Sequence, residues 1–167
     1  GGGPGWRTVR VRVERARGIP RMDLFKGADA FCTVLVEGLP DVFQTRVVQR
    51  TPAADWVWED DSEFTWRLPP PGEGDEEDEE RSVVVLVYDK DLLSSDDVVG
   101  CAAVPLARLA AHGPLHDWIP VVRPRGAAGR PEIKLRVELV ADGGSPTAAG
   151  GVRQDDQEVL PIVPCAQ

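Results

Sequence analysis

Apolar and polar residues alternate in several short segments of this chain, which is the pattern of half-buried β-strands. In the first such segment Val9, Val11 and Val13 are separated by charged residues, and residues 63–68 and 132–140 repeat the alternation. A period of two places every second side chain on the same face of a strand. The pattern therefore predicts three strands, each with one face turned toward a core.

Other strands are predicted from composition and boundaries rather than from alternation. Residues 30–37, 42–49 and 98–104 are rich in apolar residues and lie between turn-forming segments. Residues 83–88 form an uninterrupted apolar run, which predicts a strand buried on both faces. Residues 117–121 predict a short extended piece.

These segments add up to about eight strands with almost no helix, since only residues 106–112 suggest one or two helical turns. No helical crossovers separate the strands, so the pattern predicts an all-β fold, an eight-stranded antiparallel β-sandwich. We expect a flexible N-terminus at residues 1–5, one folded domain at 6–140 and a flexible C-terminal tail at 141–167, where Gly, Ser, Pro and Ala dominate.

Composition narrows the range of functions. The net charge of −9 argues against nucleic-acid binding, which depends on basic surface meeting phosphate. No stretch approaches the roughly 20 apolar residues of a membrane span, and no secretory signal pattern opens the chain. Cys32, Cys101 and Cys165 show no metal-ligand spacing, so we expect three free thiols in a reducing compartment. The sequence favours a cytoplasmic monomer.

Two segments leave room for a protein partner. Residues 72–80 hold seven carboxylates, which are typical of a solvated loop but would also suit a basic partner. The tail contains an apolar stretch at 159–163 that is suited either to packing on the sandwich or to recognising another protein. His112 and His116 are isolated, and we interpret both as structural or surface residues.

Five aspartates fall in two of the predicted loops. Asp23 and Asp29 lie six residues apart in the first, while Asp89, Asp91 and Asp97 lie in the second. Single aspartates in turns commonly bond their own backbone. A cluster of like charges costs stability unless something compensates it, and calcium takes six to eight oxygen ligands of this kind. The clustering therefore favours a divalent-cation site.

A family resemblance accompanies these loops. Residues 18–23 with 27–31 resemble the first calcium-binding loop of C2 domains, and residues 87–91 with 97–100 resemble the third. Between them lie segments similar to the family's strand, loop and tryptophan-containing strand, in the same order: 44–47, 51–52 and 58–59. The resemblance covers about residues 6–140. The strand order resembles the family's type II permutation, which is seen in phospholipase C and novel protein kinase C.

The resemblance implies calcium as a cofactor and a specific set of ligands. It implies side-chain ligation by the five aspartates and a further oxygen from Ser94. It also implies backbone carbonyl ligands from two positions, Met22 and Lys90. One departure is notable, because Ala30 stands where the family has a proline, which we expect to leave the exit of the first loop less rigid.

The tips of the two loops are apolar and resemble a membrane-docking surface. We expect calcium to offset the carboxylate charge, so that the loops approach anionic phospholipid and the chain becomes a peripheral membrane protein when calcium rises. Each buried apolar side chain contributes at most about 1.5–3 kcal/mol, which is typical of reversible attachment. Phe25 has the alternative of folding back onto the sandwich. The residues of the tips are Leu24, Phe25, Leu92 and Leu93.

Arg46 and Arg50 are candidate headgroup contacts, because many members of the family carry a basic patch on this strand. Their alternative is an ordinary solvated surface. Other functions also stay open: a protein-interaction C2 domain that needs no calcium, and a C2 domain within a larger signalling or trafficking protein.

We expect no enzyme, since no catalytic Ser/His/Asp or Cys/His set is evident. Asp89 and Asp91 after an apolar strand resemble the nucleophile motif of haloacid-dehalogenase-type phosphatases. However, Leu92 and Leu93 follow where that family has small or hydroxyl residues.

Overall fold

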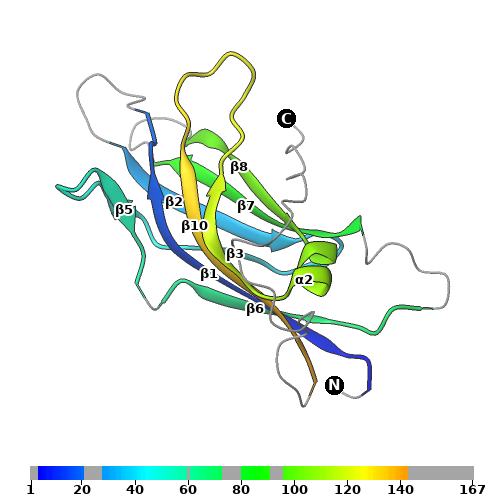
Figure 1. The fold of residues 1–167 in the computed structure, drawn as a ribbon. Helices are drawn as coiled ribbons and strands as arrows, with labels where there is room; N and C mark the ends of the chain where they lie inside the picture. The colour runs from blue at the N-terminus through cyan, green and yellow to red at the C-terminus, as the bar shows by residue number, and fades with distance from the viewer. Residues whose placement is uncertain (1–3, 21–27, 60, 73–79, 91–95, 143–167) are drawn as a thin grey trace.

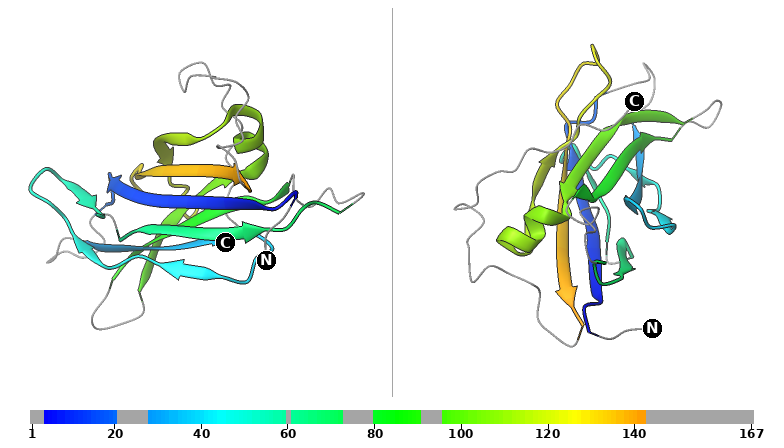
Figure 2. Two further views of the ribbon diagram at one scale, coloured as in Figure 1. Left: turned by 90° about the horizontal axis from the view of Figure 1, so that it is seen from below. Right: turned by 90° about the vertical axis from the view of Figure 1, so that its right-hand side faces the viewer.

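The computed structural model describes residues 4–20, 28–59, 61–72, 80–90 and 96–142. They form two antiparallel sheets that face each other, with one short helix at the edge (Figures 1 and 2). The prediction of an antiparallel β-sandwich is therefore confirmed. The antiparallel pairing of the strand that precedes Asp91 also removes the phosphatase alternative, which requires a parallel sheet with helical crossovers.

Sheet A is built around the first and last strands of the fold. β1 (Arg7–Arg17) pairs with β10 (Glu132–Ala141) along its whole length, with one register shift after Val13. β9 (Leu115–Pro120) lies on the other side of β10. The free edge of β1 is shared by β6 (Glu63–Leu68) and β5 (Asp55–Val57). This neighbouring of the first and last strands agrees with the expected type II order.

Sheet B resembles sheet A in that two short strands share one edge of a long strand. β2 (Asp29–Val36) pairs with β7 (Ser82–Asp89), and β8 (Asp97–Pro105) lies beyond β7. The other edge of β2 is shared by β3 (Val42–Gln44) and β4 (Val48–Gln49). The helix α2 (Leu106–His112) follows β8 and contacts both β8 and β10.

The described strands fill eight positions, because two positions are each shared by a pair of short strands. The prediction of one continuous strand at 42–49 is wrong, since it is interrupted after Gln44. There Thr45 turns inward: its amide donates to the carbonyl of Cys32 at 2.8 Å, and its hydroxyl accepts from the Cys32 amide at 2.8 Å. The short strand β5 was missed because the sequence before Trp56 reads as a turn.

The core lies between the two sheets. The predicted inward residues of β1 are fully buried, as are Val83, Val85 and Val87 of β7. Val84 and Leu86 are only half-buried. The prediction that this strand is buried on both faces is therefore wrong, since the outer face of sheet B is only partly covered.

One end of the sandwich gathers four of the connections between strands. The pairs Arg17–Glu132 and Glu132–Pro120 bring the end of β1, the start of β10 and the end of β9 together. In sheet B the end of β7 lies beside the starts of β2 and β8. We call this the loop end; it carries the connections 18–28, 50–54, 90–96 and 121–131 (Figure 1).

The cysteines differ from expectation. Cys32 is a free thiol in the core, as predicted, and burial raises its pKa so that it stays protonated. Cys101 is disulfide-bonded, so its interpretation as a free thiol is wrong. Spacing along the sequence gave no sign of this bond. In the described part of the chain no helix has the length and apolar character needed to cross a bilayer.

Candidate functional site

Three of the predicted calcium ligands lie on neighbouring strand ends of sheet B. Asp29 opens β2, Asp89 closes β7 and Asp97 opens β8. Asp89 and Asp97 are direct cross-strand partners, so their side chains leave the sheet on the same side. Two carboxylates facing each other in this way destabilise a sheet unless a cation or hydrogen-bond donors compensate them.

Hydrogen bonds fix two of these positions. The amide of Asp29 donates to Oδ1 of Asp89 at 3.2 Å, and the amide of Lys90 donates to the carbonyl of Asp29 at 2.7 Å. The start of β2 and the end of β7 are thus joined on both sides of the carboxylate. Asp29 and Asp89 are half-buried, while Asp97 is exposed.

A lysine lies beside the three aspartates. Nζ of Lys90 is 3.3 Å from Oδ2 of Asp96 and 5.9 Å from the centre of the Phe31 ring. That ring is stacked on Tyr88, with their centres 4.9 Å apart. The cation of Lys90 therefore offsets Asp96, the carboxylate next to the predicted ligand Asp97.

The exit of the first aspartate loop is held in place without the family's proline. Nε1 of Trp56, on sheet A, donates to the carbonyl of Ala28 at 2.8 Å, one residue before Asp29. Ala30 is completely buried, and Phe31 stacks on β7. These contacts position Asp29 from both sheets.

The remaining predicted residues of the two loops lie outside the described residues: Asp23, Asp91, Ser94, Met22, Leu24, Phe25, Leu92 and Leu93. Among the residues that are described, no group of three or more His, Cys, Asp or Glu is arranged to hold a metal ion. The described residues contribute carboxylate oxygens, which are ligands that calcium prefers, on adjoining strand ends.

The two candidate headgroup contacts differ from each other. Arg46 lies between β3 and β4, with its Nε 3.3 Å from a carboxylate oxygen of Asp61. Its backbone carbonyl accepts a hydrogen bond from Nε1 of Trp58. Arg50 directly follows β4, next to Gln49, the cross-strand partner of Asp29, and is exposed. Arg50 therefore lies at the loop end, whereas Arg46 is engaged along the strand edge.

Sequence reasoning missed one element of the loop end, the connection 121–131 between β9 and β10. Its base is attached to β8: Val122 and Cys101 exchange backbone hydrogen bonds of 2.8 and 2.9 Å. Nε of Arg123 donates to the carbonyl of Val99 at 2.9 Å. The available signal was three arginines within eight residues, in a segment otherwise made of Gly, Ala and Pro.

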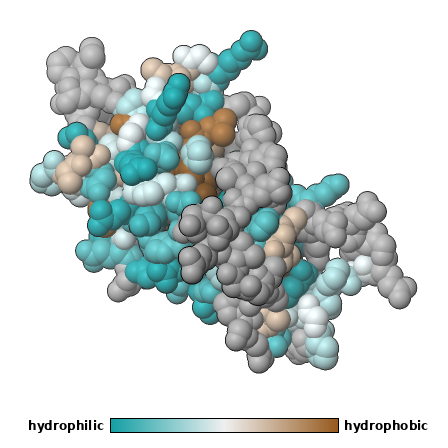
Figure 3. All heavy atoms as spheres, viewed as in Figure 1, coloured by the Kyte–Doolittle hydropathy of each residue, from teal (hydrophilic) through white to brown (hydrophobic). Residues whose placement is uncertain are grey.

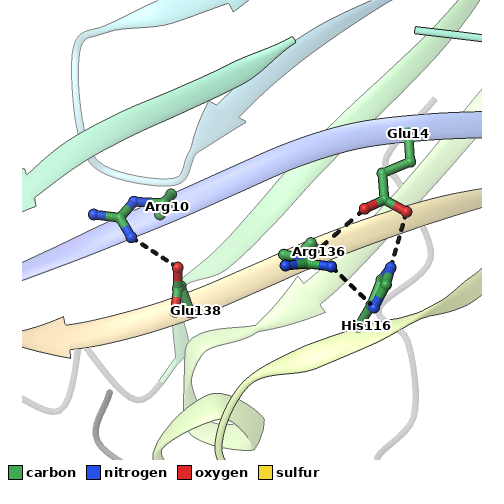
Figure 4. Close-up of polar contacts among 5 residues, drawn as sticks. All are labelled: Arg10, Glu14, His116, Arg136 and Glu138. Carbon is green, nitrogen blue, oxygen red and sulfur yellow. Dashed lines mark hydrogen bonds and ion pairs between the residues drawn. The ribbon is translucent and has the colours of Figure 1, made fainter. Parts of the chain in front are cut away.

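A second polar cluster covers the outer face of sheet A (Figure 4). Nε2 of His116 lies 2.8 Å from Glu14, and Arg136 lies 3.7 Å from the same carboxylate. Arg10 and Glu138 form a neighbouring pair at 2.9 Å. Burial alone would raise the pKa of Glu14, but the hydrogen bond with His116 and the charges of His116, Arg136 and Lys134 outweigh it and lower the pKa.

Comparison with known proteins adds the family. A model of the C2 domain family matches residues 7–121 of this chain. Ras GTPase-activating protein 4 of Mus musculus is 27% identical over 135 residues, which are 80% of this chain and 15% of that protein. Ras GTPase-activating protein 4 of Homo sapiens is 28% identical over 105 residues, which are 63% of this chain and 12% of that protein. The chain thus spans 12–15% of the length of these curated relatives.

Solved structures show the same fold. A C2 domain of plant extended synaptotagmin 1 superposes with a TM-score of 0.62 at 16% identity, covering 80% of this chain and 94% of that one. Human GIVD cytosolic phospholipase A2 gives a TM-score of 0.64 at 17% identity, covering 87% of this chain and 18% of that one. At these identities the likeness extends to the architecture of the sandwich.

Proposed function

Because this chain belongs to the C2 domain family, we propose that it binds anionic phospholipid membrane through its loop end, in a calcium-dependent manner. C2 domains are binding modules that commonly bind membranes or lipids, and the proposal assigns no catalytic residue. The finer part of the proposal is the calcium requirement and the residues that produce it.

The meeting of Asp29, Asp89 and Asp97 on three adjoining strand ends carries the proposal. The two aspartates that complete the set in sequence stand in segments next to these strands: Asp23 in the segment that leads into β2, and Asp91 in the segment between β7 and β8. The topology therefore directs both aspartate segments to one end of sheet B. A cation that accepts carboxylate oxygens would relieve the facing pair Asp89 and Asp97.

Each described residue has a distinct part in this proposal. Asp89 would offer one carboxylate oxygen to the ion while Oδ1 keeps its hydrogen bond to the Asp29 amide. Trp56 would hold Asp29 in place through Ala28. Calcium, when bound, would supply positive charge at the loop end. The phosphate oxygens of anionic headgroups would complete its coordination shell. Lys90 and Met22 would each add a backbone carbonyl as a ligand. Ser94 would add a further oxygen.

Docking also needs apolar contact. We propose that Leu24, Phe25, Leu92 and Leu93 enter the interfacial region of the bilayer, each contributing up to about 1.5–3 kcal/mol. The acidic chain would be repelled by an anionic surface until calcium changes the charge of the loop end. The result is reversible, peripheral attachment from the cytoplasmic side when calcium rises.

Co-sedimentation with phosphatidylserine-containing vesicles, across a calcium titration with magnesium and chelator arms, tests the proposal. The variant Asp89→Asn with Asp97→Asn should lose calcium binding and sedimentation together. Asparagine retains an oxygen for the Asp29 amide, so the fold should be unaffected. The matched control is Asp41→Asn with Glu63→Gln, which removes the same charge from exposed positions away from the loop end.

The outcomes separate the candidate functions. Sedimentation that needs calcium, fails in the Asp89/Asp97 variant and survives in the control supports the proposal. If the wild-type chain does not sediment at any calcium concentration, calcium-dependent docking is wrong. The alternative is then a protein-interaction C2 domain, with the acidic segment 72–80 or the tail as its contact.

A further inference from the structure

We propose that the connection 121–131 is a second anionic-lipid contact of the loop end, acting directly through Arg125 and Arg130 rather than through a metal. The inference rests on the proposed membrane docking and adds residues that bind headgroup phosphates without calcium. It follows from where this connection is attached and from which arginines, among the described residues, are left without partners.

The connection contacts residues that flank both aspartate segments. On one side its base bonds to β8 through Val122 and Cys101. A Cβ at Gly100 would lie only 2.3 Å from the Val122 carbonyl oxygen, so the two backbones are in close contact. β8 is the strand that leaves the second aspartate segment.

On its other side the connection contacts the stem of the first aspartate segment. A Cβ at Gly18 would lie 3.0 Å from the carbonyl oxygen of Arg130, and a Cβ at Gly129 would lie 3.4 Å from the Pro20 ring. Figure 1 shows the connection (yellow) projecting beyond the ends of β9 and β10. The connection therefore lies at the same end of the sandwich as the described stems of the aspartate segments.

Its arginines are available for an external anion. In the described part of the chain, Arg50, Arg125 and Arg130 are the arginines that make no ion pair and no side-chain hydrogen bond. All three are exposed and lie at the loop end. Over the sheets, by contrast, arginines are paired, as Arg10 is with Glu138.

The third arginine of the connection has a structural task. Arg123 donates to the carbonyls of Val99 and Ala128, which ties the two arms of the connection to each other and to β8. A hollow of about 360 Å³ lies at this base and is lined in part by Arg123, Arg130 and Pro131. Glu132 also lines it, and Arg17 pairs with the carboxylate of Glu132 at 3.0 Å.

Charge complementarity identifies the occupant as an anionic headgroup. The chain carries a net charge of −9, yet Arg125 and Arg130 project as cations from the end proposed to face the membrane. In Figure 3 hydrophilic side chains project from this end of the molecule. A guanidinium suits phosphate geometry, and each Lys or Arg near an anionic surface strengthens binding about fivefold.

The test compares Arg125→Ala with Arg130→Ala in one chain against the wild type, using vesicles of phosphatidylcholine with and without phosphatidylserine. In saturating calcium the double variant should bind phosphatidylserine vesicles about 25-fold more weakly, which is about fivefold for each arginine. The loss should shrink at high salt, because screening weakens exposed charges. Vesicles without phosphatidylserine should show no difference.

Two controls make the result specific. Arg10→Ala with Lys134→Ala removes the same charge from the outer face of sheet A and should weaken binding far less. Calcium titration of the free protein should be the same for wild type and for the Arg125/Arg130 variant, since neither arginine pairs with an aspartate among the described residues. The thermal unfolding midpoint should also be unchanged.

The two proposals fail in different ways. A wild-type chain that ignores vesicles in calcium overturns the proposed function and this inference with it. A wild-type chain that docks, while the Arg125/Arg130 variant matches the Arg10/Lys134 control, overturns this inference alone. An equal loss on vesicles without phosphatidylserine would also overturn it, because the contact would then not be anionic.

Discussion

The outer face of sheet A and the loop end carry similar kinds of residues in opposite arrangements. On the face, charged side chains of neighbouring strands form ion pairs, as in Arg10–Glu138 and Arg136–Glu14. At the loop end, carboxylates gather on the strand ends of sheet B, while arginines that are unpaired within the described residues stand on the flanking connections. The first arrangement contains ion pairs within the chain, whereas we propose that the second is completed by a cation and by anionic headgroups.

The comparison shows why net charge is a poor guide to partners. A value of −9 excludes a generally basic surface, but it averages over a face that contains ion pairs and an end where carboxylates and arginines stand apart. Exposed ion pairs of the first kind contribute little to stability, at most about 1 kcal/mol each. The segregated charges are those with electrostatic attraction left for a ligand.

The largest effect is expected from breaking the attachment of the loop end to the core. Trp56→Ala removes a ring that is 2% exposed and the hydrogen bond to Ala28, so the free energy of unfolding should fall by about 3–5 kcal/mol. Urea unfolding measures this. Trp56→Phe, which keeps a ring but loses the bond, should cost much less. A loss below about 1 kcal/mol for the alanine variant would contradict the packing described here.

A smaller effect is expected where the connection 121–131 is clamped. Gly100→Ala forces a methyl group against the Val122 carbonyl, and overpacking of this kind costs about 1–3 kcal/mol. Hydrogen exchange should become faster at the amides of Cys101 and Val122. The amides of Val11 and Val137, in the β1–β10 pair, serve as internal references and should not change selectively.

The smallest effect tests the paired face. Because the pKa of Glu14 is lowered from its ordinary value of 4.5, its ionised form adds stability above pH 4.5 that is lost as pH falls through the lowered value. Glu14→Gln should remove this part of the acid dependence, at most about 1 kcal/mol. Chemical denaturation at several pH values measures it, with Glu63→Gln on β6 as the control. If the free energy of unfolding of the Glu14→Gln variant falls at acidic pH as steeply as that of the wild type, the ionised Glu14 does not stabilise this face.

Much of the fold follows from the sequence because burial imposes a period. The alternation at Val9, Val11 and Val13 and at residues 63–68 predicts strands whose inward residues are buried, apart from the half-buried Phe64. Prediction fails where hydrogen bonds between residues far apart in the sequence determine the backbone conformation. Thr45 interrupts an apparent strand by bonding to Cys32, 13 residues away, and nothing local signals that exchange.

The candidate site was only partly accessible from the sequence. Clustering in two loops predicts a cation site, and the family resemblance implies that the aspartates are its ligands. The topology brings Asp29, Asp89 and Asp97 to one end. The connection 121–131 was missed because its importance lies in position alone: only the contacts with Gly18 and Gly100 reveal that it contacts residues that flank both aspartate segments. Likewise only the ion pair with Asp61 distinguishes Arg46 from Arg50.

The pairing of the first strand with the last has a mechanical consequence. Arg7 lies opposite Ala141 at the end of the sandwich away from the loops, so tension applied at these two points pulls one pair of residues apart first. The hydrogen bonds of an antiparallel pair run across the strands and are then stretched along their own direction. They break one after another from Arg7–Ala141 toward Arg17–Glu132. Under shear along the strands, by contrast, all of these hydrogen bonds would carry the force at once. A pull at this end would therefore open sheet A from the side opposite the connections 18–28 and 121–131 and reach the loop end last.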